Sequence, residues 1–147
     1  MRELVDPNMS QTQELKDIVE LRIPSKAEWV GVARLAVAGV ANRMNLSIED
    51  IEDLKLAVAE ACTNCIQHAG DSDEVRLSCE ILPSHITITV DDHPNGFAGR
   101  ELTPQESAEP QVGGLGVFLI RSLMDDVSYK YDPDSGTKLI MTKHLKA

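Results

Sequence analysis

Apolar and polar residues alternate along five stretches of the chain. A two-residue period is typical of β-strands that bury one face. It predicts strands over residues 17–23, 74–82, 85–91, 127–131 and 137–144. Pro83-Ser84 separates the second strand from the third, and Pro133-Asp134-Ser135-Gly136 separates the last two. Both segments are rich in turn-forming residues, so we expect a turn at each.

Three other stretches carry apolar residues at helical spacing and predict helices over residues 26–43, 48–69 and 117–126. Ser25, with Glu28 three residues later, has the spacing of a capping box. Ser47 precedes a first turn rich in acidic residues and is the expected N-cap of the second helix. The element order predicts an α+β fold, a two-layer α/β sandwich with helices on one face of a mixed, mostly antiparallel sheet.

The length of 147 residues fits one domain, which we place at residues 17–147. Residues 1–16 are polar and predict a flexible leader. Residues 92–112 are rich in Pro, Gly, Glu and Gln, with almost no large apolar residues. A loop of about 20 residues inside a compact domain is usually functional or disordered.

Acidic residues outnumber basic ones by 24 to 14, and the formal net charge is −10. This charge argues against direct contact with nucleic-acid phosphates and against docking on an anionic membrane. No apolar run reaches the roughly 18 residues that a membrane span requires. The chain has three cysteines, an odd and small number that fits a reducing compartment, so we expect a cytoplasmic protein.

One candidate site lies on the second helix, where Glu60, Asn64 and His68 are spaced by four residues. Successive members of such a series lie about 40° apart around a helix, so all three share one stripe. An acid, an amide and an imidazole on one stripe fit either a solvated face or a helix that lines a ligand site. In the second case Glu60 accepts a proton and Asn64 offers an oxygen to a hard cation such as Mg²⁺.

Two more candidates follow later in the chain. Asp92 comes directly after a strand and opens a segment that ends at Gly96. The segment is either an ordinary Asx-rich turn or a ligand site in which the Asp92 carboxylate accepts a hydrogen bond from an exocyclic amine. Gly113-Gly114-Leu115-Gly116 precedes an apolar helix, where free N–H groups favour anions. Neither a Gly-x-x-x-x-Gly-Lys phosphate loop nor a His-Arg-Asp kinase signature is present in the sequence.

Cys62 and Cys65 have a Cys-x-x-Cys spacing that invites a zinc or a redox interpretation. No second pair at ligand spacing accompanies them, and they lie in the middle of the predicted helix, whereas a redox pair lies at a helix start. We therefore interpret both as small buried helix residues.

Four runs of sequence extend these motifs: IEDLKLAVAEACTN (51–64) with QHA (67–69), GGLGVFL (113–119), LMDDV (123–127) and MTK (141–143). Together with Asp92-x-x-x-Gly96 and Gly136-Thr137, they resemble the GHKL ATPase superfamily and, more narrowly, the RsbW-type anti-sigma factor serine kinases. The resemblance covers residues 19–145, nearly the whole chain.

The resemblance implies a Bergerat-type ATP site with a lid at about residues 97–112. It implies that Glu60 is the general base, that Asn64 holds Mg²⁺ beside the phosphates, and that Asp92 accepts from the adenine amine. Contacts with the nucleotide are implied for residues in the same motifs, namely His68, Gly96, Phe97, Gly113, Gly114, Leu115, Gly116, Val117 and Thr137.

The function that the resemblance implies is an ATP-dependent protein-serine kinase that regulates transcription in a stress response. Such proteins, usually homodimers, hold a sigma factor inactive and phosphorylate one serine of a STAS-type anti-anti-sigma partner.

Arg34 is either an ordinary surface arginine or an anchor for an acidic patch on a partner. Pro94 stands where the family has the first glycine of its Asp-x-Gly-x-Gly box. Because proline fixes φ and lacks an N–H, an alternative stays open, a nucleotide-responsive partner-binding switch with little or no kinase activity.

Overall fold

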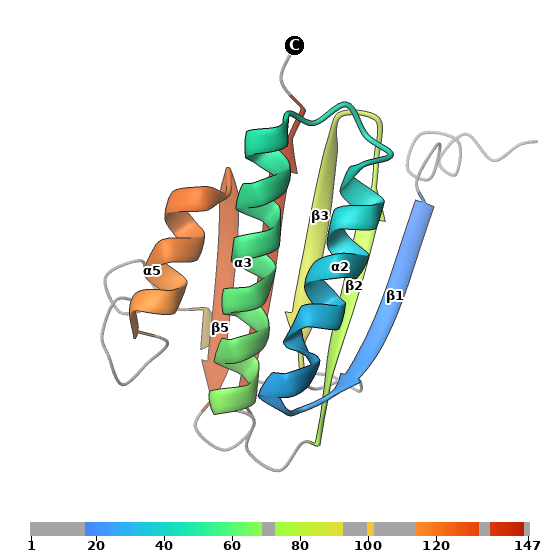
Figure 1. Ribbon diagram of the computed structural model, residues 1–147. Coiled ribbons are helices and arrows are strands. Elements are labelled where there is room, and N and C mark those ends of the chain that lie inside the picture. The colour runs from blue at the N-terminus through green and yellow to red at the C-terminus, as the bar shows by residue number, and fades with distance from the viewer. Residues whose placement is uncertain (1–16, 69–72, 93–99, 102–113, 133–135, 146–147) are drawn as a thin grey trace, which may run out of the picture.

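A computed structural model of the chain describes residues 17–68, 73–92, 100–101, 114–132 and 136–145. Its elements, in chain order, are β1 (Asp17–Pro24), a 3₁₀ turn η1 (Ala27–Trp29), α2 (Val30–Ala41), α3 (Ile48–Gln67), β2 (Glu74–Ile81), β3 (His85–Asp91), β4 (Arg100–Glu101), α5 (Gly114–Leu123), β5 (Asp126–Asp132) and β6 (Gly136–His144) (Figure 1).

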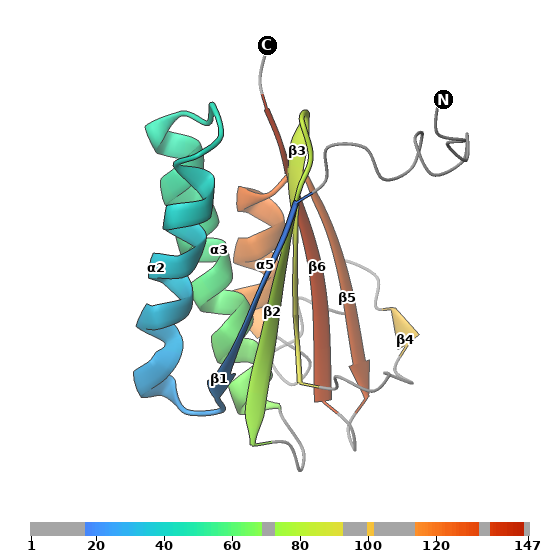
Figure 2. The same ribbon diagram turned by 90° about the vertical axis from the view of Figure 1, so that its right-hand side faces the viewer.

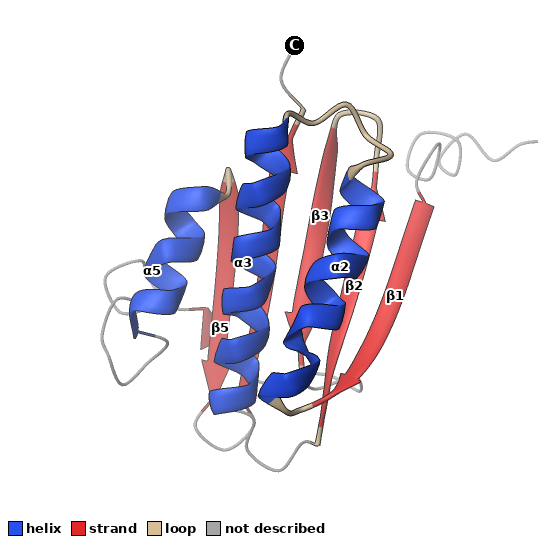
Figure 3. Cartoon of the chain, viewed as in Figure 1, coloured by secondary structure: helices blue, strands red, loops and turns tan. Residues whose placement is uncertain are grey.

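The six strands form one sheet in the order β1-β2-β3-β6-β5-β4. The three α-helices cover one face of this sheet and leave the other face open (Figures 2 and 3). The predicted α+β two-layer sandwich is therefore confirmed. All five strand pairings are antiparallel, so the described sheet contains no parallel pair. β4 lies within the predicted loop, and it pairs with β5.

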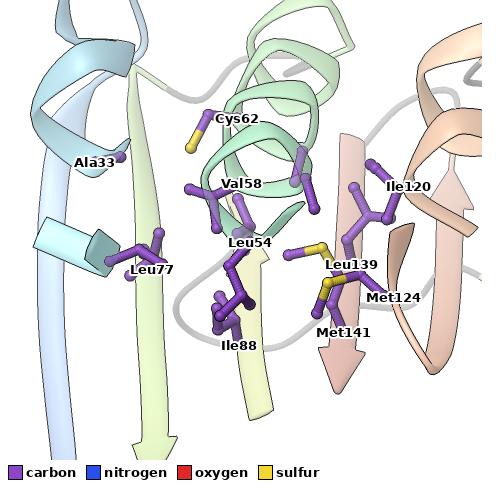
Figure 4. Packing of buried hydrophobic residues seen from close by; sticks show 14 of the residues in the cluster. Ala33, Leu54, Val58, Cys62, Leu77, Ile88, Ile120, Met124, Leu139 and Met141 are labelled. Atoms are coloured by element: carbon purple, nitrogen blue, oxygen red, sulfur yellow. The ribbon is translucent and has the colours of Figure 1, made fainter. Parts of the chain in front are cut away.

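The core lies between the helices and the side of the sheet that faces them. Every second residue of β2 and β3 is buried there, as the two-residue period predicts. α3 lies at the centre of the helix layer (Figure 1). Full burial of one large aliphatic side chain contributes about 1.5–3 kcal/mol. Figure 4 shows residues that meet in the core: Leu54, Val58 and Cys62 from α3, Ile120 from α5, Met124 directly after α5, Leu77 from β2, Ile88 from β3, and Leu139 and Met141 from β6.

The first helix does not begin as its sequence predicts. The chain enters α2 through η1; the N-cap of η1 is Lys26 and that of α2 is Trp29, and neither has a side-chain capping bond. The backbone N–H of Ser25 instead donates to the carbonyl of Asp73 at 2.9 Å, a contact between segments far apart in sequence. The predicted capping box at Ser25 is therefore wrong, because a tertiary contact sets the backbone there.

Helix α5 also begins and ends earlier than its apolar pattern predicts. It starts at Gly114 rather than Val117, so Gly116 lies in its first turn. It ends at Leu123, because Asp126 already pairs with Thr142 as the first residue of β5. Glycine is a poor helix former, so composition alone favours a loop there. No helix in the described part of the chain is long and apolar enough to cross a membrane.

Replacement of Ser47 by Ala should lower the free energy of unfolding by about 1 kcal/mol. Ser47 Oγ accepts a hydrogen bond from the backbone N–H of Asp50 at 3.0 Å, which confirms it as the N-cap of α3. The Ser25→Ala variant is the matched control, because Ser25 caps no helix in the described structure; its change should stay within about 0.5 kcal/mol. Urea denaturation measures both, and equal losses in the two variants would contradict the assignment.

Candidate functional site

The end of β3 and the start of β6 lie side by side, because the two strands are antiparallel neighbours with Asp91 in register with Lys138. Asp92 follows β3, and Thr137 is the second residue of β6. The backbone N–H of Thr137 donates to Asp92 Oδ1 at 3.4 Å, and both residues are buried. Strand pairing thus joins a carboxylate and a threonine that are 45 positions apart in sequence.

Gly136 permits this arrangement. It has φ of +115°, a region that favours glycine. A Cβ at this position would lie 2.7 Å from Oδ1 and 2.9 Å from Cγ of Asp92, closer than real Cβ contacts allow. Glycine is therefore required both by the backbone conformation and by the space that the Asp92 carboxyl group occupies.

Burial raises the pKa of the Asp92 carboxyl group from its ordinary 3.8 to about 7. The donated N–H of Thr137 acts in the opposite direction, and the nearby charge of Asp91 raises the pKa slightly further. The loss of hydration thus outweighs the hydrogen bond. At neutral pH both protonation states of this carboxyl group are populated, so a ligand that donates a hydrogen bond to it would favour the ionised form.

The hydroxyl group of Thr137 is fully buried, and its oxygen has no hydrogen-bond partner among the described residues. Burial raises the pKa of the nearby Tyr129 phenol, and the Thr137 hydroxyl group lowers that pKa by a smaller amount. The two oxygens nevertheless fall outside hydrogen-bond geometry. A buried hydroxyl group without a partner is costly, and in an enzyme it commonly marks a place that a ligand completes.

On α3, Glu60 is half-buried and Asn64 is 4% exposed. The first turn of α5 packs against both of them, because a Cβ on Gly116 would lie 3.1 Å from Glu60 Oε1 and 4.0 Å from Asn64 Nδ2. A larger residue at Gly116 would have to displace the Glu60 carboxylate. Glu60 and Asn64 therefore face a neighbouring element and do not form a fully solvated face. That they line a ligand site stays a prediction.

The N-terminal end of α5 points its free backbone N–H groups toward this same region. The first four N–H groups of any α-helix have no partner within the helix, and the helix dipole adds positive potential there. In α5 these groups belong to Gly114, Leu115, Gly116 and Val117. The Leu115 side chain is 77% exposed and that of Val117 is buried in the core, so both can serve a ligand through their backbones.

His68 is the C-cap of α3, and its ring makes an edge-to-face contact with the ring of Tyr131, with centroids 5.6 Å apart. Tyr131 is in register with Thr137, so this contact ties the end of α3 to the start of β6. Burial lowers the pKa of His68. The imidazole at this end of the stripe is thus shifted toward its neutral form.

Cys65 lies beneath the site and reaches both of its strands. Its Sγ is 3.7 Å from the carbonyl oxygen of Val90 and 3.7 Å from that of Thr137. Cys62 is buried as well, so the interpretation of the pair as small core residues is confirmed. Burial raises the pKa of Cys62 to about 12 and that of Cys65 well above its ordinary value.

Four features thus converge at one end of the fold: the carboxylate with its threonine, the acid–amide stripe, the first turn of α5 and the His68 ring. Gly96, Phe97, Gly113 and nearly all of the predicted lid at 97–112 lie outside the described residues. Arg34 is exposed on α2, which belongs to the opposite side of the helix layer from α5 (Figure 1).

Sequence reasoning gave no site role to three residues that lie here: Gly136, which was noted only beside Thr137 in the family motifs, Tyr131 and Cys65. Gly136 carried a usable signal, because a glycine before a strand that pairs with an acidic strand end marks a close approach. Tyr131 and Cys65 carried none, since their contacts join residues that are distant in the sequence.

Comparison with known proteins places these features in a family. The family described as "Histidine kinase-like ATPase domain" matches residues 23–143, most of the chain. In the solved structure of the RsbU and RsbW domains of a Mycobacterium tuberculosis protein, a similar fold occurs with a TM-score of 0.65 at 14% identity. That match covers 88% of this chain and 32% of the other, so the chain spans about a third of it.

Three curated relatives carry the name "Serine-protein kinase RsbW". The protein of Oceanobacillus iheyensis is 42% identical over 140 residues, with 88% of this chain and 87% of the relative covered. That of Halalkalibacterium halodurans is 45% identical over 139 residues, with 88% and 85% covered. That of Bacillus thuringiensis is 38% identical over 138 residues, with 87% and 85% covered.

The chain therefore belongs to the histidine kinase-like ATPase family. Within that family its relatives are the RsbW serine-protein kinases, and the resemblance predicted from the sequence is confirmed.

The free energy of unfolding of the Asp92→Asn variant should depend less on pH than that of the wild type. Between about pH 4 and pH 7 the folded protein retains a proton on Asp92 that the unfolded chain has released. Wild-type stability should therefore fall as the pH rises through this window, and the variant should lack this part of the fall. Urea denaturation at pH 5 and pH 8 measures it.

The Asp73→Asn variant, which removes an exposed carboxylate, is the control, and the pH dependence of its stability should match that of the wild type. If Asp92→Asn also follows the wild type at both pH values, the raised pKa is contradicted.

Proposed function

We propose that this protein is an ATP-dependent protein-serine kinase that also binds and inhibits a sigma factor. The observation that carries the proposal is the close approach of Gly116 to Glu60 and Asn64, at the same end of the fold as Asp92 and Thr137. The names of the curated relatives support the kinase activity. In this proposal residues 17–147 form one domain, with a lid at about 97–112.

The adenine end of the substrate ATP would lie at Asp92 and Thr137. The ionised Asp92 carboxylate accepts from the exocyclic amine, and the buried Thr137 hydroxyl gains a partner in the base or a water beside it. His68 and, by the family motifs, Gly96 and Phe97 complete this end. The phosphates would lie at the first turn of α5, where the N–H groups of Gly114 to Val117 favour anions, next to Gly113.

The donor set also fits Mg²⁺. This ion prefers oxygen ligands, takes few of them from the protein and leaves the rest to water and phosphate. Asn64 lies beside Glu60 at the edge of the cradle that a Cβ on Gly116 would fill, with its Nδ2 at 4.0 Å, and its amide group also carries an oxygen that could bind the cation. We propose that Asn64 holds Mg²⁺, which when bound would neutralise charge on the phosphates.

Glu60 would act as the general base. Its carboxylate accepts the proton of an acceptor serine hydroxyl as the serine oxygen forms a bond to the γ-phosphorus of ATP. The bond between the γ-phosphorus and its bridging oxygen breaks, and ADP leaves with that electron pair. Phosphoryl transfer relies mainly on positioning and charge stabilisation, so a site with few catalytic side chains is sufficient.

The partners are proposed from the family. The acceptor would be a serine of a STAS-type anti-anti-sigma protein, the inhibited protein would be a sigma factor, and the kinase would act as a homodimer in the cytoplasm. Arg34 is exposed on α2 among exposed apolar residues such as Val32 and Leu35. Arginine flanked by apolar surface is typical of binding hot spots, which supports Arg34 as a partner anchor.

Replacement of Glu60 by Ala should reduce phosphate transfer by about 10²–10⁴-fold, the usual contribution of a general base. ATP binding should survive, because the proposed base does not hold the nucleotide. Radiolabelled ATP with Mg²⁺ and a purified STAS-type anti-anti-sigma protein measures the transfer. Glu49→Ala, an exposed acid in the first turn of the same helix, is the control and should stay active. If the wild type binds ATP but labels no serine, the switch without kinase activity replaces this proposal.

Charge reversal at Arg34, as Arg34→Glu, should weaken capture of a sigma factor by about tenfold or more, since interface arginines often contribute 2 kcal/mol or above. ATP affinity should stay unchanged because α2 lies away from the site. Arg43→Glu makes the same charge change at another exposed position and should have a smaller effect. Pull-down with the purified sigma factor and calorimetry with ATP measure the two quantities. Unchanged capture by Arg34→Glu would refute the anchor.

A further inference from the structure

A second group of charges, two of them buried, lies at the opposite end of the helix layer from the proposed nucleotide site. Lys143, on β6, is only 4% exposed. Its Nζ donates to the backbone carbonyl of Leu123 at 2.6 Å and lies 3.7 Å from Asp50 Oδ1 and 3.6 Å from Asp53 Oδ2. The roles proposed above for Glu60, Asn64 and Arg34 do not involve this group.

The group links three elements that also build the nucleotide site. Leu123 is the last residue of α5, and Asp50 and Asp53 lie in the first two turns of α3. A buried ammonium group is tolerated only where several partners replace its water, and here the partners come from two separate helices. The cation also lies at the negative end of α5, and the acids lie at the positive end of α3, so both helix dipoles favour the arrangement.

Apolar packing alone does not fix the position of α5 along its axis. Val117, Ile120 and Met124 are buried, and Figure 4 shows Ile120 and Met124 over Leu139 and Met141. Burial of apolar surface is non-directional, so it sets the depth of the helix more strongly than its axial position. The hydrogen bond from Lys143 to the carbonyl of Leu123 is directional and acts at the helix end.

The other end of α5 has little tolerance for displacement. α5 has 10 residues, so its two ends are about 15 Å apart. Its first turn approaches Glu60 so closely that a Cβ on Gly116 would lie 3.1 Å from Oε1. A shift of about 1 Å there changes the distance between the free N–H groups and any bound phosphate, and such misplacements reduce rates by about 10²-fold.

We propose that Lys143 is a positioning residue for the phosphate end of the nucleotide site. By holding the C-terminal end of α5 against α3 and β6, it sets the place of the first turn of α5 beside Glu60 and Asn64. This inference rests on the proposed function. The adenine end, at Asp92 and Thr137, is built by direct pairing of β3 with β6 and does not depend on Lys143.

The test compares ATP with adenosine as ligands of the full chain, by calorimetry in the presence of Mg²⁺. The Lys143→Met variant keeps the length and the packing of the side chain but removes the charge and the donor. ATP affinity should fall by tenfold or more, and adenosine affinity should stay within twofold of the wild type. A merely structural role would weaken both ligands alike or neither. Lys55→Met, which removes a lysine paired with Glu52 on the outer side of α3, is the matched control and should change neither affinity.

Two further variants keep the test decisive. Lys143→Arg retains a donor for the Leu123 carbonyl and should restore part of the ATP affinity, and it replaces Lys143→Met if that variant fails to fold. Asp53→Asn leaves the Lys143–Leu123 hydrogen bond in place and should lower stability without changing the ratio of ATP to adenosine affinity. An unchanged ratio in Lys143→Met, or an equal loss of both ligands, would overturn the inference. If the wild type binds ATP no better than adenosine, the proposed function fails instead.

Discussion

The burial of one carboxyl group, that of Asp92, constrains the end of the molecule that contains the proposed site. It lies where β3 ends and β6 begins, and it is 2% exposed. The backbone N–H of Thr137 donates a hydrogen bond to this carboxyl group. Position 136 must be glycine, because a side chain there would clash with the carboxyl group. The antiparallel pairing of β3 with β6 is what brings these residues together, and Cys65 of α3 touches both strands directly below. The sheet register and the position of the central helix are thereby linked to the same few atoms.

Features set by local chemistry could be predicted from the sequence. The hydroxyl of Ser47 meets the N–H of Asp50 three residues later, and the four-residue spacing of Glu60 and Asn64 places both on one side of α3. Strand periodicity likewise gave the five main strands within one or two residues. Each of these features depends on residues that lie close together in the sequence, so propensity and periodicity are sufficient to predict it.

The remaining features depend on contacts between distant segments. Ser25 has the spacing of a cap, yet the carbonyl of Asp73 determines its backbone. The glycines before Val117 favour a loop by propensity, yet Gly116 packs against Glu60 in a helical turn. Lys143 shares the buried face of β6 with Leu139 and Met141, and the groups that pair with its ammonium come from helix ends distant in the sequence. No single segment encodes such outcomes, because they arise from the assembly of the core.

The raised thiol pKa values have a consequence for the reactivity of the three cysteines. All three cysteines are buried, and burial raises the pKa of Cys79 to about 11, in the same direction as for Cys62 and Cys65. Peroxides and other oxidants attack the thiolate form, and these side chains scarcely populate it near neutral pH. Burial thus protects these three sulfhydryl groups from direct oxidation near neutral pH.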